Sequence, residues 1–374
     1  MSDDARVPQG LRTAGAWSWR LLVILGVVAV AIWLVIQFKL VVIPFLIAIL
    51  LAALLIPFSS FLQRHRWPKW LAITASMLGG LALVGGLVTL VVFQIRGGWN
   101  ALVAATLRAV DDISVWLAAP PFNLEISEVR RTVLDWWAEF SHDTGSLWAG
   151  ALSVGTTTGH VLAGLLLTLF ATLFLLIDGP RIWGWFLRLF PRRARERTDV
   201  AARTGWTTLT TFARIQIFVA AVDAVGIGLG AWILGLFFGG FPLVIPIAVV
   251  VFLASFIPIV GALFSGALAV FVALVYLGPI PAIIMLAIVL LVQQIEGHVL
   301  QPLVMGTAVK VHPLAVVFAV AAGALIAGIP GALFAVPLVA VVNAMGRSLA
   351  GSAQGASIGI EETSPGDTAE GGAP

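Results

Sequence analysis

Long apolar runs separated by short polar breaks occupy most of the 374 residues. Two of these runs, LLVILGVVAVAIWLVIQF and VLAGLLLTLFATLFLLI, approach the ~20 residues that an α-helix needs to cross a bilayer core of ~30 Å. We therefore expect an all-α polytopic membrane protein with about eight hydrophobic segments. The predicted order is a cytoplasmic N-terminus (1–16), spans one to three (17–95), an extracytoplasmic helical segment (96–147), span four (148–177), a basic amphipathic connector (178–205), a transport core (206–347) and a disordered cytoplasmic tail (348–374).

Charge is distributed unevenly between the two largest polar segments. The connector holds seven arginines and three acidic residues, whereas the segment 96–147 holds four arginines and seven acidic residues. Because cytoplasmic loops are enriched in lysine and arginine, we expect the connector and both termini to face the cytoplasm across the plasma (inner) membrane. The connector alternates aromatic residues with arginine in RIWGWFLRLFPRR, which is typical of a helix lying in the headgroup layer.

Composition agrees with this class and excludes several functions. Hydrophobic residues make up 60% of the chain and charged residues 10%, against about 25% charged in a soluble domain. The net charge is only +3 and the basic residues flank apolar runs, so we expect no nucleic-acid partner. The chain has no cysteine, no HExxH, no GxSxG and no Walker loop. We therefore expect no enzyme activity, no cofactor, no metal and no direct use of ATP.

Two apolar stretches in the second half are too long for single straight helices. The stretches 243–277 and 313–347 each contain 35 residues, or about 52 Å at ~1.5 Å per residue. Each is interrupted near its middle, at IPIVGALF and at IPGALF, whose prolines are 72 positions apart. This match predicts an internal repeat of one span plus one broken element, either a re-entrant hairpin or a kinked span. Hairpins would make it an inverted repeat of the kind found in secondary transporters. The residues that mark the predicted breaks are Pro258, Gly261, Pro302, Gly306, Gly328, Pro330 and Gly331.

Few charged residues interrupt the transport core. Asp223 falls near the middle of a predicted span, where an unpaired carboxylate is costly and is a candidate functional group. Arg214 lies nine residues earlier, on the opposite face of the same helix and near its cytoplasmic end.

The stretch QQIEGHVLQP places a wide polar arc at the end of an apolar helix. At 100° per residue, Gln294, His298 and Gln301 share one face, and Gln293 and Glu296 lie on an adjoining strip. A plain helix end would also carry polar residues, but the width of the arc favours a cavity lining near the cytoplasmic mouth. Histidine exchanges protons near neutral pH, although a lone histidine is more often structural.

Taken in order, these motifs resemble the autoinducer-2 exporter family. The most specific block is QQIEGHVLQPLVMG followed by HPL, and FIPIVGALF and GIPGALFAVPL match as well. Near span five, Phe212 and Ile215 replace the family's usual tyrosine and glycine, whereas Arg214 and Gln216 are kept. Asp223 is not part of the family pattern. The resemblance implies a transporter that forms a homo-oligomer, with a pentamer as one form; named members export autoinducer-2, and others have been linked to sodium/proton exchange.

The leading hypothesis is a secondary transporter that exports a small polar organic molecule, driven by a proton or sodium gradient. Glu296 would bind the coupling ion, and the neighbouring glutamines would bond to the substrate. The complete candidate path comprises Glu296, Gln293, Gln294, His298, Gln301, Arg214, Gln216 and Asp223. Two alternatives stay open: a sodium/proton antiporter in which Asp223 and Glu296 exchange ions, and a non-transport membrane scaffold whose extracytoplasmic segment binds a partner.

Overall fold

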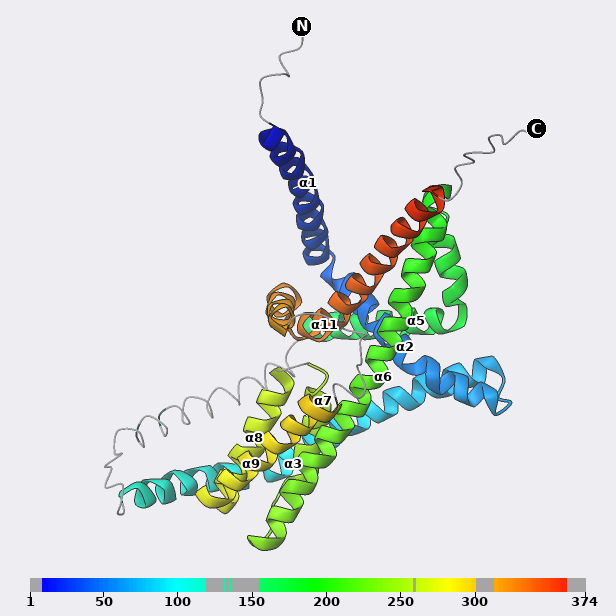
Figure 1. Cartoon of the computed structure of the whole chain (residues 1–374). Helices are drawn as coiled ribbons and strands as arrows, with labels where there is room; N and C mark the ends of the chain where they lie inside the picture. Colours follow the sequence, from blue (N-terminus) through cyan, green and yellow to red (C-terminus); the bar gives the residue numbers. More distant parts are fainter. Residues whose placement is uncertain are drawn as a thin grey trace, which may run out of the picture.

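The computed structural model describes residues 9–118, 155–257, 260–300 and 313–361, together with Arg131 and Asp135. Long helices dominate these residues (Figure 1). They are α1 (Gln9–Gln37), α2 (Lys39–Arg64), α3 (Lys69–Ala118), α5 (Gly155–Leu187), α6 (Arg192–Phe237), α7 (Val244–Ala254), α8 (Val260–Leu277), α9 (Pro279–Ile295), the π-helix η2 (Glu296–Leu300) and α11 (Pro313–Glu361). In this part of the chain eight helices are long and apolar enough to cross a membrane, which confirms the predicted class.

Two of the helices are much longer than a bilayer is thick. The 50 residues of α3 and the 46 residues of α6 correspond to about 75 Å and 69 Å at ~1.5 Å per residue. The boundaries expected near residues 95 and 206 therefore fall inside continuous helices. Beyond Ala118, the predicted extracytoplasmic segment lies outside the described residues except at the two isolated positions. At the other end of the chain, α11 continues to Glu361, so the first part of the expected disordered tail is helical.

The predicted connector is formed by the adjoining ends of α5 and α6, which we call the α5–α6 elbow (residues 178–203). Helix α5 bends at Asp178, whose φ of −127° and ψ of 18° are not helical, two residues before Pro180. Lys69 Nζ, at the start of α3, donates to the carbonyl oxygen of Ile177 at 2.8 Å. The bend therefore lies at the end of the apolar run of α5, beside the basic turn between α2 and α3.

The first predicted break separates α7 from α8. Helix α7 ends at Ala254 and α8 begins at Val260; Pro258 lies outside the described residues. The two helices pack against each other, and a Cβ added to Gly261 would collide with the carbonyl oxygen of Ala254. Only glycine fits such a close approach of two backbones.

The second break lies within α11. Ala327 and Gly328 leave the helical region, and Gly328 has a φ of 65° and a ψ of −146°, which is essentially restricted to glycine. A Cβ on Gly331 would collide with the carbonyl oxygen of Gly323, although eight residues of straight helix would separate them by about 12 Å. The arms on the two sides of Gly328 therefore fold back onto each other. The arms of both broken elements are in contact, as in the hairpin interpretation; their re-entrant position in a membrane and the inverted repeat stay predictions.

The main hydrophobic core joins α6, α7, α8 and α9. Ile227 and Met285 are fully buried in it. Alanine and glycine recur at the contacts, and small residues allow membrane helices to approach closely. Helix α2 packs on α5, and the second arm of α11 packs on the N-terminal half of α6. The long helix α6 therefore contacts both broken elements.

Replacing Gly331 by alanine tests the fold-back within α11. The added methyl group would collide with backbone, so we expect a loss of at least about 1–3 kcal/mol of stability. Gly346→Ala is the matched control, because Gly346 lies in the same helix with open space around it. The control should be neutral or up to ~1 kcal/mol more stable through helix propensity. Thermal unfolding in detergent micelles measures both; equal unfolding temperatures would contradict the folded-back arms.

Candidate functional site

Helices α6 and α9 pack antiparallel along a register set by small residues. A Cβ on Gly230 would meet the side chain of Ile288, and further along α6 a Cβ on Gly226 would meet Val292. Moving toward the N-terminus of α6 thus corresponds to moving toward the C-terminus of α9. The same register continues into η2, where Leu300 shares a buried cluster with residues of α6.

This register brings Asp223 of α6 together with Glu296, the first residue of η2. Asp223 is only 2% exposed, and the negative charge of Glu296 acts on its carboxylate. Within the described residues, Asp223 Oδ1 is buried and accepts no hydrogen bond. A membrane interior offers no water to satisfy such an atom, so the pair is costly unless a proton or cation is bound.

Ser255 links Asp223 to the first helix break. Its hydroxyl lies 3.1 Å from Asp223 Oδ2 and 2.8 Å from the carbonyl oxygen of Val251. A hydroxyl has one proton, so it can donate fully to only one of these acceptors at a time. Gln216 Nε2 donates to the carbonyl oxygen of Ser255 at 2.6 Å, and this bond is buried. Asp223, Ser255 and Gln216 therefore form one network between α6 and the end of α7.

The π-helix η2 changes the direction of the polar arc predicted from sequence. A π-turn inserts an extra residue per turn, and such turns often occur at functional sites. Glu296 is half-buried, and Gln293 Nε2 is buried with no hydrogen-bond partner in the part of the chain that the structure describes. In contrast, Gln294 and His298 are exposed, and His298 Nδ1 lies 3.2 Å from the carbonyl oxygen of Gln294.

The predicted path residues thus fall into three groups. Gln216, Asp223, Gln293 and Glu296 lie around the contact between α6, the end of α7 and η2. Arg214, Gln294 and His298 are exposed, away from this contact. Gln301 alone forms the third group, because it lies outside the described residues, as do Pro302 and Gly306 of the predicted breaks.

Sequence reasoning missed Ser255. The available signal was its position: it is a polar residue inside a long apolar stretch, three residues before the proline of the first break. Nothing in the sequence paired it with Asp223, because the pairing depends on how α7 packs against α6.

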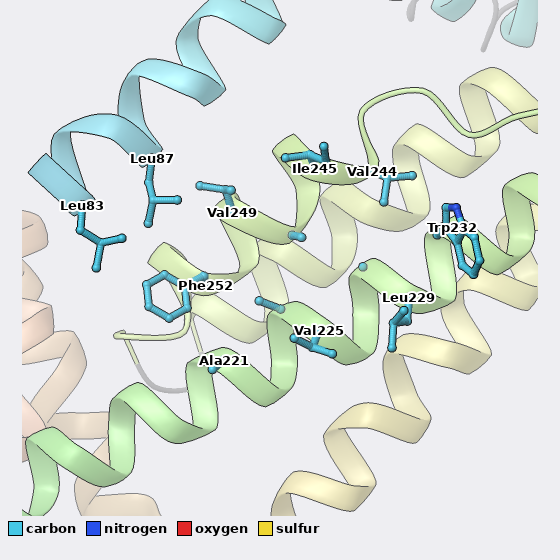
Figure 2. A pocket seen from close by; sticks show the side chains of 13 residues that line it. Leu83, Leu87, Ala221, Val225, Leu229, Trp232, Val244, Ile245, Val249 and Phe252 are labelled. Carbon is cyan, nitrogen blue, oxygen red and sulfur yellow. The ribbon is translucent and has the colours of Figure 1, made fainter.

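An apolar cavity of about 560 Å³ lies on another face of α6. It is lined by α3, α6 and α7, and Figure 2 shows Leu87, Val225 and Phe252 among the side chains around it. Ala221 and Val225 are each two residues from Asp223, which places them about 160° around the helix from it. The indole of Trp232 carries the only polar side-chain atom in this lining. The cavity therefore suits hydrocarbon and not a polar substrate.

The fold and the site define a polytopic helical membrane protein with two broken elements and a buried aspartate close to a half-buried glutamate, an arrangement typical of secondary transporters. A sequence profile described as "AI-2E family transporter" matches residues 21–351. The chain belongs to this family, and its general function is transport.

Curated relatives agree with this assignment. A Mycobacterium tuberculosis (strain CDC 1551 / Oshkosh) protein named "Putative transport protein MT0215" is 39% identical over 341 residues, which cover 91% of this chain and 92% of the relative. The Bacillus subtilis (strain 168) protein "Putative transport protein YrrI" is 26% identical over 84% of this chain and 87% of the relative. "Putative transport protein YueF" from the same organism is 25% identical over 80% of this chain and 82% of the relative.

Gln216→Leu tests the link between α6 and the first break. The substitution leaves the buried carbonyl of Ser255 unpaired, so we expect a loss of about 1–3 kcal/mol of stability. Gln294→Leu is the control, because Gln294 is an exposed glutamine in the same membrane core. Thermal unfolding in detergent compares the two. A Gln216→Leu protein as stable as Gln294→Leu would show that the bond does not hold the break.

Proposed function

We propose that this protein is a secondary transporter that exports a small polar organic molecule of the autoinducer-2 type, driven by a proton or sodium gradient. The family assignment supports transport in general. The observation that carries the finer proposal is the buried Asp223 close to the half-buried Glu296, beside a helix break.

One additional proton on Asp223 would end the competition for the hydroxyl of Ser255. When Asp223 is ionised, its carboxylate competes with the carbonyl of Val251 for the single proton of Ser255. When Asp223 carries a proton, its own O–H can donate to Ser255 Oγ, and the Ser255 proton is then available to Val251. Binding of a proton also removes the repulsion between Asp223 and Glu296. A sodium ion bound by Asp223 Oδ1 would relieve the same repulsion, so the proposal includes both ions.

The position of the pair connects ion binding to movement of helices. Asp223 lies on α6, Ser255 ends α7, and Glu296 begins η2. A change of charge at this contact alters the forces between three elements, one of which, α7, is an arm of the first broken element. Broken helices are the elements that rearrange when secondary transporters alternate their access.

The substrate would bind near the unpaired amide of Gln293, where a donor lies one turn from Glu296. The proposed location is the plasma (inner) membrane with both termini in the cytoplasm, which the arginine-rich elbow supports. We further propose that the protein works as a homo-oligomer.

Efflux from proteoliposomes tests the proposal. The wild type should release autoinducer-2 faster when a proton or sodium gradient is imposed. Asp223→Asn and Glu296→Gln should each reduce gradient-stimulated efflux at least about tenfold, because each removes a carboxylate that binds the coupling ion. Asp112→Asn is the control, because Asp112 is an exposed carboxylate near the far end of α3.

Two results would contradict this function. Unchanged efflux in both carboxylate variants would remove the pair from the mechanism. Absence of efflux from folded wild-type protein, with any imposed gradient, would reject export of this substrate.

Sodium/proton exchange is the second candidate function, and the same carboxylate pair favours it. In this case a sodium gradient alone should drive a pH change inside liposomes that contain no organic substrate. The change should disappear in Asp223→Asn. A sodium-driven pH change together with no autoinducer-2 efflux would favour the antiporter.

A further inference from the structure

The part of α5 that follows the bend at Asp178 carries an uncovered apolar stripe. Ile182, Trp185 and Phe186 recur at the spacing that places residues on one helix face, and Leu189 extends the stripe into the turn that follows α5. Their exposed fractions are between 39% and 66%. The ring of Phe186 packs 5.5 Å from that of Phe190, so aromatic contacts help to order the stripe. Apolar side chains this exposed indicate an apolar partner.

Three arginines surround the end of this stripe. Arg188, Arg192 and Arg193 are exposed, and no carboxylate among the described residues forms an ion pair with them. Two acidic residues of the elbow are already engaged, Asp178 with Arg181 at 3.1 Å and Asp199 with Arg203 at 2.8 Å. The third, Glu196, is exposed and offsets only one of the three charges.

Internal hydrogen bonds hold the elbow in shape. Arg195 donates from Nε to the carbonyl oxygen of Phe190 and from Nη2 to that of Arg188, both at 2.9 Å. Trp183 Nε1 donates to Asp199 Oδ1 at 2.8 Å, which joins α5 to α6. The three arginines are therefore presented by a braced turn and not by a loose loop, which lowers the entropy cost of binding.

The arginine-rich sequence predicts that the elbow lies at the level of the bilayer surface. The apolar run of α5 ends at Ile177, where Lys69 caps the carbonyl and α5 changes direction; the change of direction can be followed in Figure 1. An amphipathic helix at this level places its apolar side chains among acyl chains and its charges among headgroups. A second copy of the chain fits less well, because pairing this face with itself would bring basic edges together.

We propose that the elbow is a binding surface for anionic phospholipid headgroups, with the apolar stripe inserted into the leaflet. Arg188, Arg192 and Arg193 would bind the headgroup phosphates. Guanidinium groups suit this task, because their planar N–H donors bind phosphate oxygens in pairs.

Lipid bound at the elbow would also affect transport. Helix α6 begins at the elbow and runs without a break through Asp223 to Phe237. Anionic lipid that holds the elbow therefore fixes the depth and tilt of the helix that carries the carboxylate. This consequence rests on the proposed function, whereas the binding of lipid does not.

Lipid binding to the purified full-length protein tests the proposal. Native mass spectrometry would count the dioleoyl phosphatidylglycerol and phosphatidylcholine molecules retained in detergent. The wild type should prefer phosphatidylglycerol. Each arginine near a lipid surface contributes about fivefold to the affinity for an anionic lipid. Phosphatidylglycerol should therefore bind roughly a hundredfold more weakly to the triple variant Arg188→Gln/Arg192→Gln/Arg193→Gln. Replacing the same three residues by lysine should restore most of the binding.

Control variants separate this surface from charge in general. Arg20→Gln/Lys39→Gln/Arg108→Gln removes the same number of exposed positive charges elsewhere and should leave the preference unchanged. Leu189→Gln keeps every arginine and should still weaken binding through the stripe. Inorganic phosphate should not displace the lipid, because it cannot occupy the apolar part of the surface.

Several results would overturn the proposal. They are an equal preference in the wild type and the triple glutamine variant, displacement of lipid by phosphate, or no preference for the anionic lipid. A change in oligomer mass for Leu189→Gln with unchanged lipid binding would assign the stripe to self-association instead. In proteoliposomes, transport should rise with the fraction of phosphatidylglycerol for the wild type and not for the triple variant. A wild-type protein that prefers phosphatidylglycerol but shows no transport would contradict the proposed function and leave the lipid-binding surface supported.

Discussion

One hydrogen bond holds the first helix break in place: Gln216 donates to the carbonyl oxygen of Ser255 at 2.6 Å. An interrupted helix leaves backbone carbonyls without intrahelical partners, and hydrocarbon cannot satisfy them. Helix α6 supplies the missing donor, so α7 must end against this part of α6. The hydroxyl of Ser255 then reaches Asp223, and the packing of α9 on the same helix adds Glu296. The need to satisfy the backbone carbonyl of Ser255 therefore helps to set the position of the site around Asp223 and Glu296.

The close packing around this network explains how a charged pair is accommodated. Glycine and alanine on α6 let α7 and α9 approach, as at Gly228 and Gly230. Asp223 is 2% exposed, so its charge is weakly screened. The proposed binding of a proton or a small cation would relieve the cost of an ionised pair at this position. The neighbouring apolar cavity lies on another face of α6 and does not contribute polar groups to it.

Much of the fold followed from periodicity and length alone. Apolar runs of about 20 residues predicted the spans, and the overlong stretches around Pro258 and Pro330 predicted the breaks, because these properties are local to the sequence. The lengths of α3 and α6 did not follow, since polar residues are compatible with a helix that leaves the membrane.

The candidate site could be predicted from the sequence only in part. Asp223 and Glu296 were identifiable because charge is rare in a bilayer, but their proximity depends on the register between α6 and α9. The helical wheel already separated Gln294 and His298 from Gln293 and Glu296, but it could not show which of the two strips faces α6.

A double-mutant cycle at Asp223 and Glu296 tests most directly whether the two carboxylates act on each other across α6 and η2. Unfolding of wild type, Asp223→Asn, Glu296→Gln and the double variant would be measured in detergent, without any substrate. Each single substitution removes the same repulsion, so the double variant should gain less stability than the sum of the two, by about 0.5–3 kcal/mol. Strictly additive effects would show that the two residues do not interact, and the proposed ion site would lose its basis.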